Sequence, residues 1–157
     1  SLGRLFDGVA ALIGVRDTVA FEGQAAMELE MMAAASVEDV YTCGWTSDPI
    51  RRIRPASIIK GVVADLMDNI PGAVISARFH ATLVTLFVAL CQDLRRAHGL
   101  QRVAMSGGVF QNATLLSGLM RALEQQGFEV YTHKQVPAND GGIALGQVIV
   151  AAAVFQT

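Results

Sequence analysis

Two strand-like segments, each followed by a polar loop and a helical pattern, occupy the last third of the chain. The strand patterns cover Arg102–Met105 and Glu129–Thr132, and the helical patterns behind them cover residues 112–126 and 140–153. A strand, helix, strand, helix order with short connections predicts a parallel or mixed sheet covered by helices, which is an α/β fold. Ligands bind such sheets at the carboxyl ends of the strands. We therefore expect both polar loops to converge on one edge of a shared sheet.

The part of the chain before these units is predicted to be mostly helical. Apolar residues recur at three- and four-residue steps from Leu2 to Ile13, which indicates an amphipathic helix. The region from Val37 to Arg54 loses this period; Tyr41 to Trp45 favours a strand and Asp48-Pro49 a turn, so a small hairpin is expected. Further helices are predicted over residues 22–35, 55–69 and 75–97, the last one long and buried. Residues 1–157 are expected to form a single domain, or one lobe of a larger one.

Apolar residues are more abundant than in an average soluble domain. Hydrophobic residues make up 52% of the chain and charged residues 17%, whereas charged residues approach roughly a quarter of typical domains. This surplus predicts a face that contacts something else. The longest apolar stretch, Ile143–Phe155, is shorter than the ~20 residues that cross a bilayer. It is predicted to be a buried helix.

Charge and cysteine content argue against several classes of function. A net charge of −2 without a basic stripe disfavours a nucleic-acid partner. Cys43 and Cys91 have neither Cys-x-x-Cys spacing nor a disulfide framework, which is typical of a reducing compartment. No signal peptide is indicated, because Arg4, Asp7 and Arg16 interrupt the first apolar region. We expect a cytoplasmic protein with no membrane partner.

The first polar loop contains the glycine pair Gly107-Gly108, between Ser106 and Asn112. Two glycines at a strand end let the backbone turn tightly and approach a ligand, and the helix behind them directs N–H groups toward an anion. Asn112 is placed either to cap that helix or to bond a ligand hydroxyl. A tight strand-to-helix turn without a ligand would have the same pattern. Ser106 has no evident base partner, and no Gly-x-Ser-x-Gly or Walker pattern indicates acyl-enzyme or P-loop chemistry.

The second polar loop, Pro137 to Gly142, is centred on Asp140. Asp140 is placed to cap the helix behind it, to bind a metal ion, or to orient a phosphate-bound metal. A single carboxylate does not make a metal site, so further ligands would have to come from outside the chain. The three histidines are not paired at helical spacing. His80 is expected in or near the core and His98 at a helix end, with His133 a minor site candidate.

Four motifs, taken together and in this order, resemble the C-terminal region of the HypF family of hydrogenase maturation carbamoyltransferases. The motifs are Gly3–Ala10, Phe21–Glu28, Ser106–Asn112 and Pro137–Gln147. The resemblance extends over essentially the whole chain and implies the fold of the sugar kinase and actin superfamily, in which two lobes clasp a nucleotide. The chain resembles the second lobe, a helix-rich lobe with a mixed sheet flanked by helices.

The resemblance also implies a reaction. In the HypF family a carbamoyl group, activated as an adenylate, passes to the C-terminal cysteine of the partner protein HypE, and the product becomes a cyanide ligand of the hydrogenase iron. The implied cofactors are ATP or carbamoyl-adenylate, and a divalent metal (iron, zinc or magnesium) completed by histidines outside this chain. The implied partners are a HypE-type acceptor and the rest of the HypF chain.

Site residues are implied by position within the four motifs. Asp7 matches the aspartate that reaches the ribose, and Glu22-Gly23 lies where a sibling family has a nucleotide-contacting glycine. Gly107-Gly108 and Asn112 match the turn that cradles the nucleotide, and Asp140 matches the carboxylate ligand of the metal. Because the other lobe is missing, we expect the isolated chain to be inactive and to self-associate through an exposed apolar patch.

Two alternatives remain on the same fold. A tRNA threonylcarbamoyl-transferase-like lobe usually has small residues where this chain has Phe110-Gln111, and it lacks the Gly141-Gly142 pair. A non-catalytic nucleotide-binding module would bind nucleotide without transferring a group.

Overall fold

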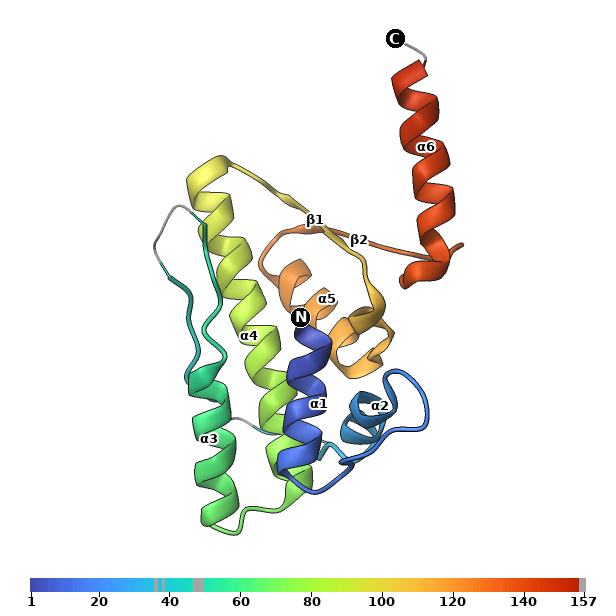
Figure 1. Cartoon of the computed structure of the whole chain (residues 1–157). Helices are drawn as coiled ribbons and strands as arrows, with labels where there is room; N and C mark the ends of the chain where they lie inside the picture. Colours follow the sequence, from blue (N-terminus) through green and yellow to red (C-terminus); the bar gives the residue numbers. More distant parts are fainter. Residues whose placement is uncertain (36, 38, 47–49, 156–157) are drawn as a thin grey trace.

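The computed structural model describes residues 1–35, 37, 39–46 and 50–155, in which a two-stranded sheet lies at one edge of a group of helices (Figure 1). The helices are α1 (Leu2–Leu12), α2 (Gln24–Met31), α3 (Ala56–Met67), α4 (Gly72–His98), α5 (Ala113–Gln125) and α6 (Ile143–Phe155). The strands are β1 (Arg102–Met105) and β2 (Glu129–Thr132), and two short 3-10 helices are η1 (Gly108–Gln111) and η2 (Asp140–Gly142). The helices predicted from the sequence are all present, with ends shifted by a few residues.

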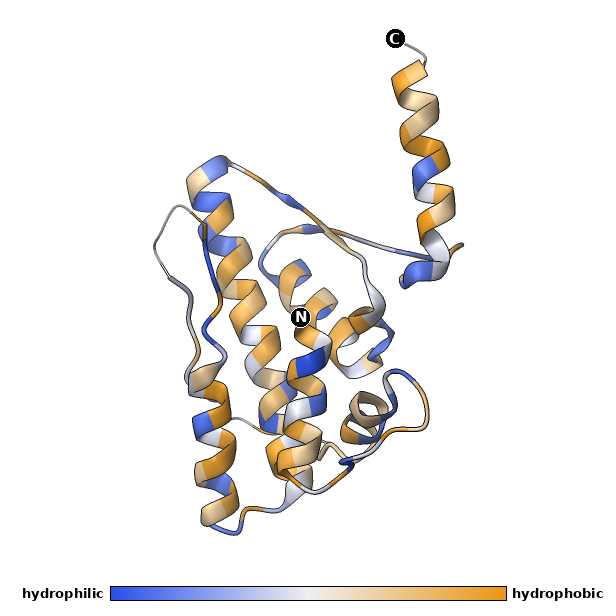
Figure 2. Ribbon diagram, in the orientation of Figure 1, coloured by the Kyte–Doolittle hydropathy of each residue, from blue (hydrophilic) through white to orange (hydrophobic). Residues whose placement is uncertain are grey.

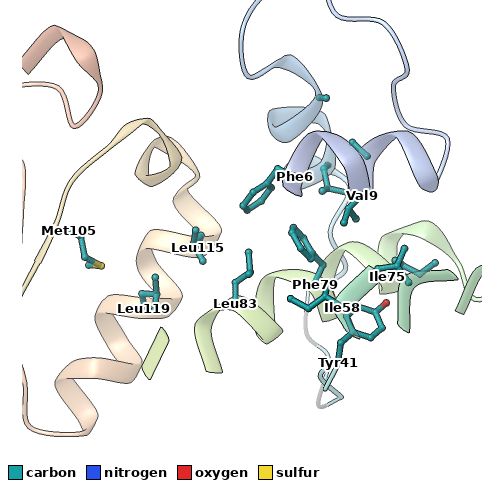
Figure 3. Close-up of a cluster of buried hydrophobic side chains, with 14 of the residues drawn as sticks. Phe6, Val9, Tyr41, Ile58, Ile75, Phe79, Leu83, Met105, Leu115 and Leu119 are labelled. Atoms are coloured by element: carbon teal, nitrogen blue, oxygen red, sulfur yellow. The ribbon is translucent and has the colours of Figure 1, made fainter. Parts of the chain in front are cut away.

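Helix α4 is the central element of the fold. It packs against α2, α3 and α5, and its Phe79 meets Phe6 of α1 edge-on, with ring centroids 4.9 Å apart (Figure 3). Gly99, with a φ of 69°, ends the helix directly after His98, as the sequence predicts. The buried side chains of α4 explain why this region of the sequence is apolar on most faces, because removing apolar surface from water is the main force that stabilises a core.

The sheet consists of two parallel strands. Arg102 pairs with Glu129 and Met105 with Thr132, so the carboxyl ends of β1 and β2 lie side by side. Helix α5, which connects them, packs against α4 and β2. This crossover confirms the α/β class and the helix-rich lobe predicted from the sequence. Among the described residues the two strands pair in parallel, whereas the resemblance implied a mixed sheet.

The predicted hairpin is reduced to a single antiparallel bridge between Trp45 and Ile53. The predicted turn at Asp48-Pro49 lies outside the described residues. A strand at Tyr41 was a wrong prediction: its N–H donates to Thr82 Oγ1 of α4 at 2.8 Å, and its hydroxyl donates to Asp65 of α3 at 2.7 Å. This segment therefore packs on helices instead of pairing with another strand.

Helix α6 projects away from the rest of the fold, and apolar residues lie on nearly all its faces (Figures 1 and 2). The prediction that this stretch is buried was wrong within this chain, because none of its residues is buried. Val148, Ile149 and Val150 are each 60–64% exposed. The expected exposed apolar patch is therefore present.

One described helix, α4, is long and apolar enough by length and composition to cross a membrane. Much of its apolar surface lies inside the core, against α2, α3 and α5. That packing accounts for its composition.

Candidate functional site

The two polar loops meet at the carboxyl ends of β1 and β2, as predicted. The backbone N–H of Gly107 donates to the carbonyl oxygen of Ala138 at 2.7 Å, which joins the two loops directly. Beside this link, a Cβ added to Gly108 would lie 3.9 Å from Asn139 Cβ, so the two loops run close together there as well. Both loops therefore belong to one edge of the sheet.

Two glycines allow this arrangement of the backbone. Gly107 has a φ of 113°, in the region that residues with a Cβ rarely adopt. At Gly142, a Cβ would lie only 2.7 Å from the carbonyl oxygen of Pro137, closer than a Cβ comes to a non-bonded atom. A side chain at Gly142 would therefore push apart the loop that holds Ala138.

Asn112 caps α5, as one alternative predicted. Its Oδ1 accepts from the Leu115 N–H at 2.7 Å, and its Nδ2 donates to Nε2 of His80 at 3.0 Å. Asn112 is 8% exposed. Because both ends of its side-chain amide are bonded, Asn112 holds the helix behind the glycine turn in place, and a direct bond from it to a ligand stays a prediction.

His80 lies in the core, as predicted, and its protonation state follows from its partners. Nε2 accepts from Asn112, so the proton of the neutral ring is on Nδ1, which donates to the Ser76 carbonyl oxygen at 2.8 Å. Burial lowers the pKa of His80 below its ordinary value, since the charged ring would lose its hydration. The neutral ring connects α4 to the first turn of α5.

Asp140 is exposed in the second loop, and Asn139 rather than Asp140 provides the cap there. Asn139 Oδ1 accepts from the Gly141 N–H at 3.0 Å, whereas the Asp140 carboxylate forms no hydrogen bond or ion pair with another described residue. The described ranges contain no group of three or more His, Cys, Asp or Glu side chains that could hold a metal ion. One uncommitted carboxylate fits a metal site whose remaining ligands come from elsewhere.

The remaining predicted residues are exposed on neighbouring elements. Asp7 lies on α1, which contacts η1, while Glu22-Gly23 precedes α2. Helix α2 is tied to the start of α5, because Glu30 accepts from the Thr114 N–H at 2.7 Å. These contacts connect α1 and α2 to the glycine turn. In the described part of the chain, Asp7 and Glu22 do not themselves bond to that turn.

A side-chain pair that the sequence did not reveal lies beside the glycine turn. His133 Nε2 and Ser106 Oγ are 2.9 Å apart, and both residues are exposed. The interpretation that Ser106 has no base partner was therefore wrong. Ser106 is the first residue after β1 and His133 the first after β2, so the missing signal was the register of the two strands.

Two hollows lie away from this edge. One of about 450 Å³ is lined by residues such as Cys43, Trp45 and Arg54, and burial raises the pKa of the Cys43 thiol. The other, of about 300 Å³, is bordered by Tyr41 and by Arg78, which bonds Asp65 through Nη1 at 2.9 Å. Burial, followed by the hydrogen bond to Asp65, raises the pKa of Tyr41, so this hydroxyl stays protonated. Neither hollow contains a residue of the two polar loops.

A comparison with protein families matches residues 1–147 to the family described as "Carbamoyltransferase, Kae1-like Domain, second subdomain". The carbamoyltransferase HypF of Synechocystis is 35% identical over 153 residues, covering 95% of this chain and 19% of the relative. The HypF of Rhodobacter capsulatus is 38% identical over 161 residues, covering 100% of this chain and 20% of the relative. The chain thus spans about a fifth of the length of these relatives.

Two solved structures have the same fold. A full-length HypF in a phosphate- and nucleotide-bound form superposes with a TM-score of 0.97 and 44% identity, over 100% of this chain and 21% of that one. The HypF of T. kodakarensis has a TM-score of 0.84 at 24% identity, over 99% of this chain and 20% of that one, a likeness that concerns the fold.

Proposed function

The chain belongs to the HypF carbamoyltransferase family, and on that premise we propose that it forms one wall of the cleft in which carbamoyl transfer takes place. In the complete protein, the joined loops at Gly107 and Asp140 would hold a nucleotide and a metal ion. An adenylate-activated carbamoyl group would then pass to the C-terminal cysteine of a HypE-type acceptor. The observation that carries the proposal is the 2.7 Å hydrogen bond that unites the two loops.

Nucleotide binding is supported by the form of the glycine turn. Gly107 and Gly108 have no side chains to cover the backbone, Gly108 is the first residue of η1, and α5 begins at Ala113. Such backbone N–H groups, at the start of helical turns, favour phosphate groups. A full-length relative that is 44% identical over this whole chain was crystallised with phosphate and nucleotide.

Metal binding is supported by the free carboxylate of Asp140. A hard oxygen ligand on an exposed loop suits a divalent cation, and such a cation, when bound, polarises phosphate and carbonyl oxygens as a Lewis acid. Asp140 would supply one ligand and histidines elsewhere in a longer protein the others. The residues of the second loop would hold the Asp140 carboxylate at the edge of the sheet where the glycine turn lies.

The rest of a longer HypF chain is the proposed partner of α6. The described helix exposes apolar side chains on nearly all faces, and a helix of that kind is normally buried. The full-length relative superposes on the whole chain, α6 included, while this chain accounts for 21% of that protein. We propose that the remaining part covers α6 and that the chain alone is inactive.

The cytoplasm is the proposed location. Cys43 and Cys91 are both free and only partly exposed. Unpaired cysteines of this kind fit a compartment that keeps thiols reduced.

The test is Asp140→Ala in the complete protein. We expect loss of bound metal, measured by elemental analysis, and loss of carbamoylation of an acceptor that ends in cysteine, measured by mass spectrometry. Asp17→Ala, which removes an exposed carboxylate from the loop between α1 and α2, is the matched control. If Asp140→Ala keeps both its metal and its transfer rate, Asp140 is not a metal ligand.

A further inference from the structure

Ser106 and His133 occupy equivalent places at the edge of the sheet. Each is the residue directly after a parallel strand, and the last strand residues, Met105 and Thr132, are paired with each other. The side chains meet at 2.9 Å between Ser106 Oγ and His133 Nε2. Ser106 is followed at once by Gly107, whose N–H binds the second loop. The pair therefore adjoins the proposed nucleotide edge.

His133 differs from the buried histidine of the chain in what its ring can do. Both ring nitrogens of His80 are bonded inside the core. The His133 ring is exposed, and Ser106 is its hydrogen-bond partner among the described residues, through Nε2. When Nε2 donates to Ser106 Oγ, Nδ1 carries the free lone pair of the neutral ring and can accept a proton.

We propose that His133 accepts the proton of the acceptor thiol during carbamoyl transfer and that Ser106 positions its ring. This inference rests on the proposed function. A free cysteine thiol has a pKa of about 8.5 and is mostly protonated at neutral pH, whereas the thiolate is the nucleophile. An imidazole beside the nucleotide edge supplies the missing proton acceptor.

Transfer forms one S–C bond and breaks one C–O bond. His133 Nδ1 takes the thiol proton, and the sulfur electron pair forms the S–C bond to the carbamoyl carbon. The bond from that carbon to the phosphate oxygen of the adenylate breaks, and AMP leaves with the electron pair. The imidazolium then releases its proton to water. Positioned bases of this kind accelerate proton transfers by about 10²–10⁴-fold.

The experiment uses the complete protein and separates two half-reactions. Adenylate formation is followed as pyrophosphate released from ATP, and transfer as carbamoylation of an acceptor peptide ending in cysteine. We expect His133→Ala to form adenylate at the wild-type rate and to transfer about 10²–10⁴-fold more slowly. Added imidazole should restore part of the transfer rate. Ser106→Ala, which keeps the base but frees its ring, should lose less than His133→Ala.

His98→Ala is the matched control, because His98 is an exposed histidine at the C-terminal end of α4, outside the two polar loops. The inference is overturned if His133→Ala transfers at the rate of this control, or if its loss is not rescued by imidazole and extends to adenylate formation. A carbamoyl group found on Ser106 by mass spectrometry would also overturn it, since Ser106 would then be a nucleophile. A wild-type protein that forms adenylate but carbamoylates no thiol would instead refute the proposed function.

Discussion

At the scale of single residues, the glycine turn depends on backbone geometry that only glycine adopts easily. Gly107 combines a φ of 113° with the hydrogen bond to Ala138. Gly146 lies in α6, where an added Cβ would meet nothing within 4 Å beyond the backbone of its own helix. The same substitution should therefore have opposite effects at these two glycines.

We predict that Gly107→Ala lowers the free energy of unfolding by about 1–3 kcal/mol, because alanine at this φ is strained. Gly146→Ala should be neutral or stabilise the chain by up to about 1 kcal/mol, because alanine favours a helix. Urea unfolding followed by circular dichroism measures both. Equal effects of the two substitutions would show that the turn does not need glycine.

His80 predicts how stability depends on pH. Its pKa in the folded chain lies below the ordinary value of 6.5, mainly because of burial. The unfolded chain then binds the proton at a higher pH than the folded chain does. His80 therefore contributes fully to the free energy of unfolding above about pH 6.5. This contribution is lost as the pH falls from there through the pKa of the folded chain, and the free energy of unfolding then changes by at most about 1.4 kcal/mol per pH unit.

Urea unfolding at a series of pH values tests this prediction. His80→Gln should flatten the fall in stability below pH 6.5, while His98→Gln controls for the loss of one imidazole outside the core. An unchanged slope in His80→Gln would mean that the folded chain tolerates a charged ring at this position.

Local chemistry determined which residue roles could be predicted. The cap at Asn112 and the turn at Gly107 follow from residue type and from position at a strand end, so both were predictable. The bond between Ser106 and His133 depends on the register of two strands separated by a helix, which local sequence does not encode. The sequence left three roles open for Asp140; the structure gives the cap to the neighbouring Asn139, and the metal-binding roles stay predictions.

At the scale of elements, α6 shows a limit of reasoning from composition. A stretch as apolar as Ile143–Phe155 is expected to be buried, and composition alone does not say by what. In the predicted hairpin, strand propensity was misleading. Tyr41 has a strand-forming side chain, but its polar groups bond to Thr82 of α4 and Asp65 of α3 and not to another strand. Long amphipathic helices were the most predictable elements, since the spacing of their apolar residues indicates both the helix and its buried face.

Substitutions in α6 should affect the isolated chain and the complete protein differently. The double substitution Val148→Ala and Ile149→Ala removes side chains that are 64% and 60% exposed in this chain. The isolated chain should keep or slightly gain stability, because alanine is the better helix former. The complete protein should lose about 2 kcal/mol or more, as large-to-small changes in a core do.

Chemical unfolding of both forms measures the difference. A loss of similar size in both forms, or none in the complete protein, would contradict the proposal that the rest of the chain covers α6.

At the scale of the whole molecule, the exposed apolar helix should make the isolated chain associate with itself. We predict that light scattering gives a mass that rises with concentration. Replacing Val148 and Val150 with lysine should abolish the rise, because each is 64% exposed and lies on α6. A constant monomeric mass for the unsubstituted chain at all concentrations would contradict this prediction.

The central claim is that the two loops form a single nucleotide-binding edge. Isothermal titration of the complete protein with a non-hydrolysable ATP analogue tests it most directly, using Gly142→Ala and the control Gly44→Ala, at a glycine outside both loops where an added Cβ would meet nothing within 4 Å. A Cβ at Gly142 would press on the Pro137 carbonyl and displace the Ala138 partner of Gly107. We predict that Gly142→Ala binds the analogue at least about tenfold more weakly, a change of about 1.4 kcal/mol, while the control binds like wild type. Equal affinities in all three proteins, with Gly142→Ala still folded, would contradict the account.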